Sequence, residues 1–289
     1  MSSFPRYLVA LITPFTADGE LDLEAHRHNL TTLAATGING FVIGGSNGEG
    51  PYLEAGERTQ LVSVGRETLG DDAHIMCGVM AETVRNATRQ LGEATEAGAD
   101  SVLCLTPTTL TRNRPEAVER YFTAVAEAST LPMMLYSVPI TTAYNLEETT
   151  IERLSTHPNI HGMKDSSGDP VRMQSIVGSV PEDFLMWSGS SPALTLVVTA
   201  GAYGSITGSG NYVPYLVQET LSASLNDPLE ARSLQARLGA ISRTVEPKGI
   251  AAVKAASQAA GLRPGHVRAP LADVPSGLAA ELQEAVRNI

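Results

Sequence analysis

The sequence contains little lysine and little positive charge. Only three of its 20 basic residues are lysines (Lys164, Lys248 and Lys254), and 31 acidic residues bring the net charge to −11. A chain this acidic has few groups to neutralise phosphates, which argues against nucleic acid and anionic membranes as partners. Any chemistry that needs a side-chain primary amine is restricted to these three residues.

Cysteine is also scarce. Cys77 and Cys104 each lie in a short apolar run, which is typical of buried, reduced thiols and excludes a disulfide framework. His26 and His28 stand two positions apart on a predicted helix, so they do not share a face and no metal site is expected. The apolar stretch Tyr7–Ile12 is too short for a signal peptide or a membrane span. We therefore expect a cytoplasmic protein.

Hydrophobic residues make up 43% of the chain and form short apolar runs that alternate with longer amphipathic stretches. Eight such runs, each followed by a helical pattern, predict an α/β protein with a (β/α)8 TIM barrel. An open nucleotide-binding sheet is the alternative, but no G-x-G-x-x-G or P-loop motif follows any run. We expect one domain over 1–289, with the barrel over about 1–225 and C-terminal helices over about 226–289. The runs begin at Tyr7, Gly40, Ala73, Ser101, Pro132, Ile160, Phe184 and Ala202.

Lys164 lies at the end of the sixth run, IHGMK. Catalytic groups of barrels lie where the strands end, and an apolar barrel mouth favours the neutral amine that attacks carbonyl carbon. A structural lysine capped by Asp165 is the alternative. Lys248 and Lys254 lie in helical patterns, where we expect their amines to reach solvent. The residues thus favour imine chemistry at Lys164.

Two further groups stand at the ends of predicted strands, and one of them is on the strand next to that of Lys164. Tyr136 ends the fifth run, MMLY, where its phenol could transfer the protons that imine formation requires. A core tyrosine bonded to a backbone carbonyl is the alternative. The GSNGE segment at 45–49 follows the second run, and its N–H groups, hydroxyl and amide suit a substrate carboxylate. The same residue types also form ordinary tight turns.

Taken together, GSNGE, YSVP and GMKDSSGD, spaced over eight βα units with a helical tail, resemble the dihydrodipicolinate synthase and N-acetylneuraminate lyase family of class I aldolases. The GSNGE turn, YSVP, HPNIHGMKDSSGD and RAPL are most similar to its 4-hydroxy-2-oxoglutarate aldolase branch. The resemblance covers essentially the whole chain. It implies a TIM barrel, a covalent imine with no metal or other cofactor, pyruvate and an aldehyde as small-molecule partners, and a homo-oligomer, either a dimer or a tetramer.

The resemblance also implies roles for individual positions. Lys164 matches the lysine that forms the imine, and Tyr136 matches the tyrosine that relays protons. The turn residues Ser46, Asn47 and Gly48 match positions that hold the oxo-acid carboxylate. Gly189 and Ile206 match two backbone positions beside the imine, and Ser166 matches a hydroxyl near the lysine. Ser46 is also implied in the proton relay.

Two positions depart from the family pattern. Thr109 replaces a second relay tyrosine, and its hydroxyl is a much weaker acid than a phenol. Thr141 stands where dihydrodipicolinate synthases carry an arginine that grips the carboxylate of the aldehyde substrate. Arg112 or Arg114, in TRNRP, is a candidate contact for a distal carboxylate.

The expected activity is cleavage or formation of a C–C bond in a 2-oxo acid, giving pyruvate and an aldehyde. A 4-hydroxy-2-oxoglutarate substrate would give pyruvate and glyoxylate. The alternatives are a 2-keto-3-deoxy sugar acid dehydratase or aldolase, a 4-hydroxy-tetrahydrodipicolinate synthase, which Thr141 disfavours, and a non-catalytic protein that binds keto acids.

Overall fold

A computed structural model describes residues 4–289 and shows a closed barrel of eight parallel strands, each paired with its neighbour in chain order. The pairing of β1 with β8 closes the barrel. The strands are β1 (Tyr7–Ala10), β2 (Gly40–Ile43), β3 (His74–Val79), β4 (Ser101–Leu105), β5 (Met133–Ser137), β6 (Ile160–Asp165), β7 (Leu185–Ser188) and β8 (Gly204–Thr207). The predicted (β/α)8 barrel is confirmed.

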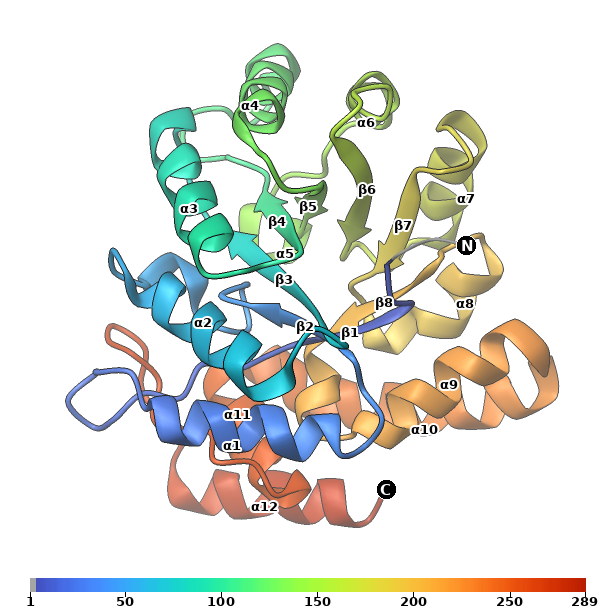
Figure 1. Cartoon of the computed structure of the whole chain (residues 1–289). Helices are drawn as coiled ribbons and strands as arrows, with labels where there is room; N and C mark the ends of the chain where they lie inside the picture. Colours follow the sequence, from blue (N-terminus) through green and yellow to red (C-terminus); the bar gives the residue numbers. More distant parts are fainter. Residues whose placement is uncertain (1–3) are drawn as a thin grey trace.

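Helices surround the strands, and three more follow the eighth βα unit (Figure 1). The surrounding helices are α1 (Leu23–Ala34), α2 (Glu57–Leu69), α3 (Val84–Glu96), α4 (Pro115–Ala128), α5 (Pro139–Thr142), α6 (Glu148–Leu154), α7 (Pro170–Ser179), α8 (Leu194–Thr199) and α9 (Pro214–Asn226). The C-terminal extension contains α10 (Pro228–Val245), α11 (Ile250–Ser257) and α12 (Ser276–Arg287). Short 3-10 turns are η1 (Gly50–Tyr52), η2 (Ser191–Ala193), η3 (Gly208–Asn211), η4 (Glu246–Lys248) and η5 (Gln258–Ala260).

The helix boundaries follow local capping chemistry. Thr83 accepts a hydrogen bond from the N–H of Asn86 at the start of α3, and the side chain of Asp227 accepts two at the start of α10. These oxygens satisfy N–H groups that have no partner inside the helix. Gly70, which ends α2, has a φ of 68°, a conformation that glycine adopts without steric cost.

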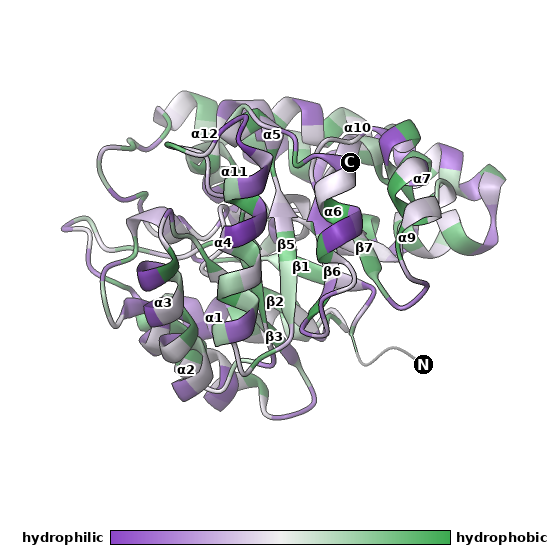
Figure 2. Ribbon diagram, turned by 90° about the horizontal axis from the view of Figure 1, so that it is seen from above, coloured by the Kyte–Doolittle hydropathy of each residue, from purple (hydrophilic) through white to green (hydrophobic). Residues whose placement is uncertain are grey.

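The strand residues divide between two apolar regions. One set of side chains fills the interior of the barrel, and the alternate set packs outward against the helices. Figure 2 shows mainly hydrophobic strands, with helices beside them that carry hydrophilic stretches. The interior set is Leu8, Ala10, Val42, Met76, Met80, Leu103, Met134, Tyr136, Val138, Trp187 and Ile206.

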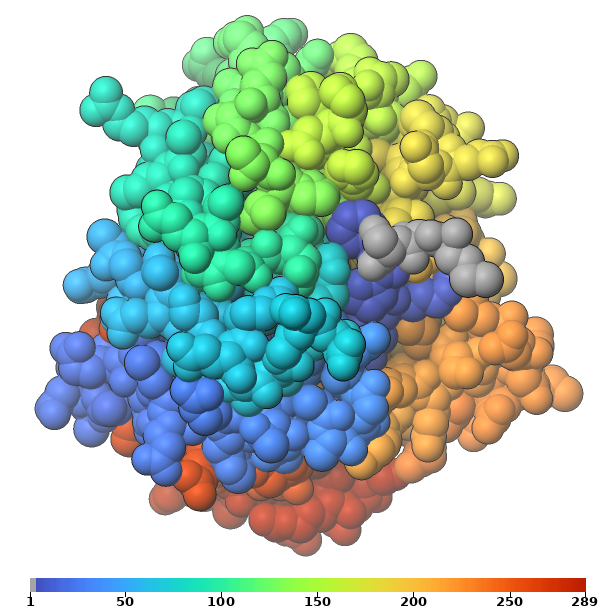
Figure 3. All heavy atoms as spheres, in the orientation of Figure 1, coloured from blue at the N-terminus to red at the C-terminus, as the bar shows by residue number. Residues whose placement is uncertain are grey.

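The C-terminal extension packs beside the first helix. The Asn29 side chain in α1 donates to the carbonyl of Arg263 at 2.9 Å and accepts from its N–H at 2.7 Å. The first and last parts of the chain therefore lie side by side, as the adjacent blue and red regions of Figures 1 and 3 show. Among residues 4–289, no helix is both long and apolar enough to cross a membrane.

His26, on α1, should make the protein sensitive to acid. The side chain is 1% exposed, and burial lowers its pKa from 6.5 to about 4. Because the pKa of His26 is lower in the folded state than in the unfolded state, the fold keeps its full stability at pH values above the unfolded-state pKa. That stability is lost as the pH falls toward 4. The loss amounts to roughly 3 kcal/mol. The free energy of unfolding, measured in urea between pH 7 and 4, should therefore fall more steeply with decreasing pH for the wild type than for His26→Gln. Identical slopes would contradict this assignment.

Candidate active site

Lys164 lies near the carboxyl end of β6 and is 3% exposed. The β5–β6 register pairs it with Tyr136, and its Nζ lies 4.4 Å from the centroid of the tyrosine ring. Within residues 4–289, its amine has no ion pair and no hydrogen bond. An aromatic face attracts a cation but does not use the nitrogen lone pair. No ion pair or hydrogen bond within the described residues therefore engages the nitrogen that would attack a carbonyl carbon.

Asp165 does not cap Lys164. Its carboxylate lies 2.8 Å from Nε of Arg172 on α7, and it also accepts a hydrogen bond from the N–H of Ser167 at 2.6 Å. Both partners of this ion pair are buried, so the negative charge of Asp165 is already compensated. The structure therefore contradicts the alternative of a lysine held by its neighbouring aspartate.

The other two lysines have different environments. Lys248 is exposed, as predicted, and donates to the carbonyl of Thr244 at 2.5 Å. The prediction that Lys254 is solvated is wrong. Lys254 is 2% exposed, and its Nζ lies 2.5 Å from both Glu49 Oε1 and the carbonyl of His266. The physical reason is that α11 is otherwise almost entirely apolar and packs inside the molecule, where Glu49 supplies the compensating charge.

Glu49 ends the GSNGE segment, so the Lys254 pair connects this turn to the C-terminal extension. The second carboxylate oxygen of Glu49 accepts a hydrogen bond from the N–H of Arg268 at 2.9 Å. Burial lowers the pKa of Lys254, while the Glu49 carboxylate opposes that shift. The backbone of Glu49 has a left-handed conformation, with φ of 53°. A buried ion pair thus holds an unfavourable backbone conformation at the base of the turn.

The turn itself follows β2 and lies at the same end of the barrel as Lys164. Ser46 and Asn47 are half-buried, and Gly48 is buried. The Thr13 hydroxyl donates to the Gly48 carbonyl at 2.7 Å, which fixes the turn to the segment after β1. A Cβ built at Gly208 would lie 2.6 Å from Oδ1 of Asn47, so the backbone after β8 packs closely against this amide.

Ser46 is brought to Tyr136 as the resemblance implies. The Ser46 hydroxyl donates to the Tyr136 phenol oxygen at 3.3 Å, and Tyr136 is 2% exposed. Within residues 4–289, the Tyr136 phenol makes no hydrogen bond to a backbone carbonyl, which was the alternative for a core tyrosine. Tyr136 is thus hydrogen bonded to the turn after β2 through its phenol oxygen, while the Lys164 amine lies over the face of its aromatic ring.

Three further predicted positions also border Lys164 or the barrel interior. A Cβ built at Gly189 would overlap Oγ of Ser166 and lie 2.9 Å from Cε of Lys164. Glycine at position 189 therefore leaves the space that the lysine side chain occupies. Ile206 is fully buried in the same interior cluster as Tyr136. The structure brings all of these residues to one end of the barrel.

The positions that depart from the family pattern lie outside this cluster. Thr109 and Thr141 are exposed, in the β4–α4 connection and on α5. The N–H of Thr109 donates to Glu82 at 2.9 Å, whereas its hydroxyl has no hydrogen-bond partner within the described part of the chain. Arg112 and Arg114 are exposed in the same connection. Among the described residues, Thr109 makes no hydrogen bond to the Tyr136 phenol.

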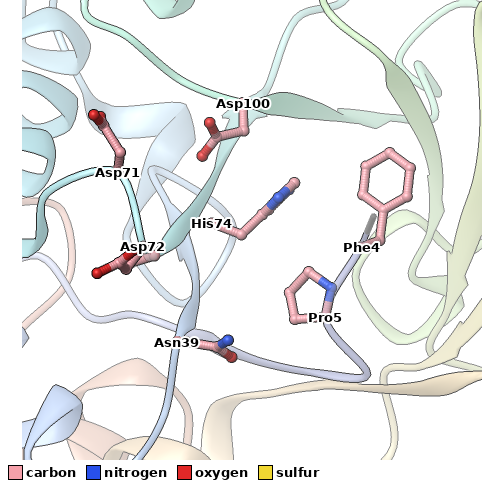
Figure 4. Close-up of a pocket in the computed structure, with 8 residues that line it drawn as sticks. Phe4, Pro5, Asn39, Asp71, Asp72, His74 and Asp100 are labelled. Carbon is pink, nitrogen blue, oxygen red and sulfur yellow. The ribbon is translucent and has the colours of Figure 1, made fainter. Parts of the chain in front are cut away.

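A separate hollow of about 340 Å³ lies at the opposite, amino-terminal end of the strands. Figure 4 shows His74 pointing toward Phe4, while the carboxylates of Asp71 and Asp72 point away from it. His74 is hydrogen bonded to Ser101 at 2.8 Å, and burial lowers its pKa. Conserved chemistry in barrels lies at the other end. Across residues 4–289, no group of three or more histidine, cysteine or acidic side chains could hold a metal ion.

Comparisons with known proteins agree with this geometry. Residues 3–289 match the model of the dihydrodipicolinate synthetase family. A 4-hydroxy-tetrahydrodipicolinate synthase of Streptomyces coelicolor is 34% identical over 93% of this chain and 88% of its own. A dihydrodipicolinate synthase from Bacillus anthracis superimposes with a TM-score of 0.94 at 27% identity, covering 100% and 99% of the two chains. An Acinetobacter baumannii dihydrodipicolinate synthase solved with pyruvate gives a TM-score of 0.89 at 26% identity, covering 97% of each chain.

Proposed function

Because the chain belongs to the dihydrodipicolinate synthetase family of pyruvate-dependent class I aldolases and lyases, we propose that it cleaves a 4-hydroxy-2-oxo acid through an imine on Lys164. The observation that carries this proposal is the state of the three lysines. Lys248 is exposed and Lys254 is paired with Glu49, whereas the buried Lys164 amine has neither an ion pair nor a hydrogen bond within residues 4–289.

The reaction begins when the neutral Lys164 amine attacks the C2 carbonyl of the oxo acid. Loss of water from the carbinolamine gives an iminium, which accepts electrons from the adjacent carbon. The C4 hydroxyl then loses its proton as the C3–C4 bond breaks, and an aldehyde departs. The remaining enamine takes up a proton at C3, and water hydrolyses the imine to pyruvate and the free lysine. No redox reagent is consumed.

Tyr136 is positioned for the proton transfers of this sequence. Its ring faces the lysine amine at 4.4 Å, and Ser46 hydrogen bonds its phenol oxygen at 3.3 Å. A phenol in this place can protonate the departing hydroxyl of the carbinolamine and recover a proton from the C4 hydroxyl. We assign Tyr136 as the acid–base group and Ser46 as its hydrogen-bonding partner.

The carboxylate of the oxo acid would bind at the GSNGE turn. The backbone N–H groups and side chains of Ser46 and Asn47 are half-buried at the mouth, where they can donate to an anion. Gly48, Gly189 and Ile206 shape the surrounding surface, and Ser166 places its hydroxyl beside the lysine. This arrangement orients the C2 carbonyl toward Nζ.

Replacement of Tyr136 by phenylalanine tests the proton-transfer role. The variant should form the imine more slowly and lose about 10²- to 10⁴-fold in kcat, because general acid–base catalysis contributes that much. Steady-state cleavage assays would measure the loss. Ser46→Ala, which leaves the phenol in place, should have a smaller effect. A Tyr136→Phe variant with wild-type kcat would overturn the assignment.

We propose 4-hydroxy-2-oxoglutarate as the substrate, with pyruvate and glyoxylate as products, because Thr141 lacks the charge that would bind aspartate semialdehyde. The names of the curated relatives favour a second candidate, synthesis of 4-hydroxy-tetrahydrodipicolinate. Product analysis separates them. Pyruvate release from 4-hydroxy-2-oxoglutarate supports the cleavage activity. If the enzyme does not cleave this substrate but condenses pyruvate with aspartate semialdehyde, the synthase activity is supported. A dioxo acid formed from a 3-deoxy sugar acid would identify a dehydratase.

Arg112 and Arg114 are proposed to bind the distal carboxylate of that substrate from the β4–α4 connection. Both are exposed and carry the positive charge that a diacid would require. Arg112→Ala and Arg114→Ala should raise KM for the diacid more than for a monoacid substrate. Unchanged KM values for both substrates would remove this assignment without affecting the imine mechanism.

We also propose that the enzyme forms a homo-oligomer, either a dimer or a tetramer. Leu110 and Ile140 are 84% and 90% exposed on the connections after the adjacent strands β4 and β5. Exposed apolar side chains on neighbouring connections are typical of contact surfaces. Light scattering should give a multiple of 30.5 kDa, and Leu110→Asp with Ile140→Asp should shift the mass downward.

A further inference from the structure

Glu246, at the start of η4, is a half-buried carboxylate of the C-terminal extension. Its Oε1 accepts hydrogen bonds from the Ser191 hydroxyl at 3.0 Å and the Tyr212 phenol at 3.1 Å. Both donors are neutral. In the described residues, no lysine, arginine or histidine nitrogen pairs directly with Glu246, although a buried carboxylate is costly without a cation.

A chain of hydroxyl groups extends from this carboxylate toward the end of β8. The Ser191 hydroxyl lies 2.8 Å from that of Ser209, which donates to the hydroxyl of Thr207 at 3.2 Å. Thr207 directly follows Ile206, and Ser191 stands two residues after Gly189. Both of these neighbours are positions that border the lysine or the barrel interior. Glu246 thus fixes the two backbone segments that flank the reacting amine.

The charge of the reacting amine influences the pKa of the same carboxylate. Burial raises the pKa of Glu246, and the hydrogen bonds from Ser191 and Tyr212 and the positive charge of Lys164 oppose that rise. Burial and the negative charge of Glu246 raise the pKa of Tyr212, behind which lies the buried phenol of Tyr7. Lys248, on η4 itself, is exposed and bonds to Thr244. Among the described residues, Lys164 is the cation whose charge influences the pKa of Glu246, whereas Lys254 on α11 is paired with Glu49.

We propose that Glu246 is a positioning residue for the imine step, holding the segments beside Lys164 through Ser191 and Ser209 and compensating the positive charge of the iminium. This inference rests on the proposed imine at Lys164. The role requires the carboxylate to be ionised, since only the anion compensates the iminium. Protonation of Glu246 at low pH should therefore slow imine formation in the wild type.

The test measures the rate at which pyruvate and cyanoborohydride, a hydride donor that persists in mild acid, trap the enzyme, together with kcat and KM, between pH 5 and 8. Glu246→Gln keeps a hydrogen-bond acceptor but has no charge. It should lower the trapping rate and kcat on the order of 10- to 100-fold at pH 8, as expected for a misplaced reacting group, with little change in KM. The ratio of wild-type to variant rates should fall as the pH decreases and the wild-type carboxyl becomes protonated.

Two further variants keep the test decisive. Ser191→Ala retains the charge but cuts the hydroxyl chain, so it should slow trapping less than Glu246→Gln and keep the pH dependence of the wild type. Glu182→Gln, at an exposed glutamate before β7, is the matched control and should leave all rates unchanged. If Glu246→Gln and Ser191→Ala both trap pyruvate at the wild-type rate, or if the rate ratio is constant with pH, the inference is overturned. If the wild type itself forms no adduct, the proposed function fails instead.

Discussion

The Lys164→Ala variant is expected to lose on the order of 10⁶-fold in kcat for cleavage of the oxo acid, because removal of a covalent nucleophile has effects of this size. Alanine has no amine with which to form the iminium that accepts the electrons of the breaking bond. Coupled detection of released pyruvate would measure the loss. Binding of the oxo acid at the GSNGE turn should persist, since Ser46 and Asn47 are unchanged.

Lys248→Ala provides the matched control for this prediction. Its amine is exposed and bonds only to the Thr244 carbonyl within the described residues, so kcat should stay at the wild-type value. Circular dichroism of both variants would separate lost chemistry from lost structure. Wild-type turnover by Lys164→Ala would exclude the imine at this position. If the wild type shows no turnover and Lys164→Ala binds pyruvate with the same affinity as the wild type, the results would favour a non-catalytic binding function.

The Lys254→Met variant is expected to lose about 3–5 kcal/mol of unfolding free energy, because it leaves the buried Glu49 carboxylate without its cation. Lys254 and Glu49 are both almost fully buried, at 2% and 2% exposure. The GSNGE turn depends on this pair, so KM for the oxo acid should also rise. The midpoint of urea unfolding measures the first effect, and steady-state kinetics measure the second.

A double variant separates the ion pair from packing. Lys254→Met combined with Glu49→Gln removes both charges, so it should recover part of the stability lost in Lys254→Met. Gln at position 49 keeps the acceptor that the N–H of Arg268 uses. If the double variant is less stable than Lys254→Met by the full cost of Glu49→Gln alone, the two side chains do not interact and the assignment of the pair is wrong.

The barrel was predictable because its information is local. Each strand is a short apolar run, and the helix ends carry capping residues, such as Thr83 and Gly70, that are visible within a few positions. The end-of-strand rule also placed Tyr136 and Lys164 on adjacent strands, and the register then set them opposite each other. Because all strands of a parallel barrel end at the same rim, the order of the strand ends in the sequence gives their order around that rim.

Contacts between distant segments were not predictable in the same way. Lys254 lies about 200 residues from Glu49, and nothing near either residue identifies the partner. The apolar composition of α11 was the one available signal that a charged residue there is buried. Similarly, the hydrogen-bond network of Glu246 depends on three turns that are far apart in the sequence.

Borohydride reduction in the presence of pyruvate, followed by peptide mass mapping, tests the central claim most directly. Reduction converts a transient imine into a stable secondary amine on the lysine that formed it. The account predicts one pyruvate-derived adduct, on the peptide that contains Lys164, and none on the peptides that contain Lys248 or Lys254. An adduct on either of those lysines, or no adduct on any lysine, would contradict the account.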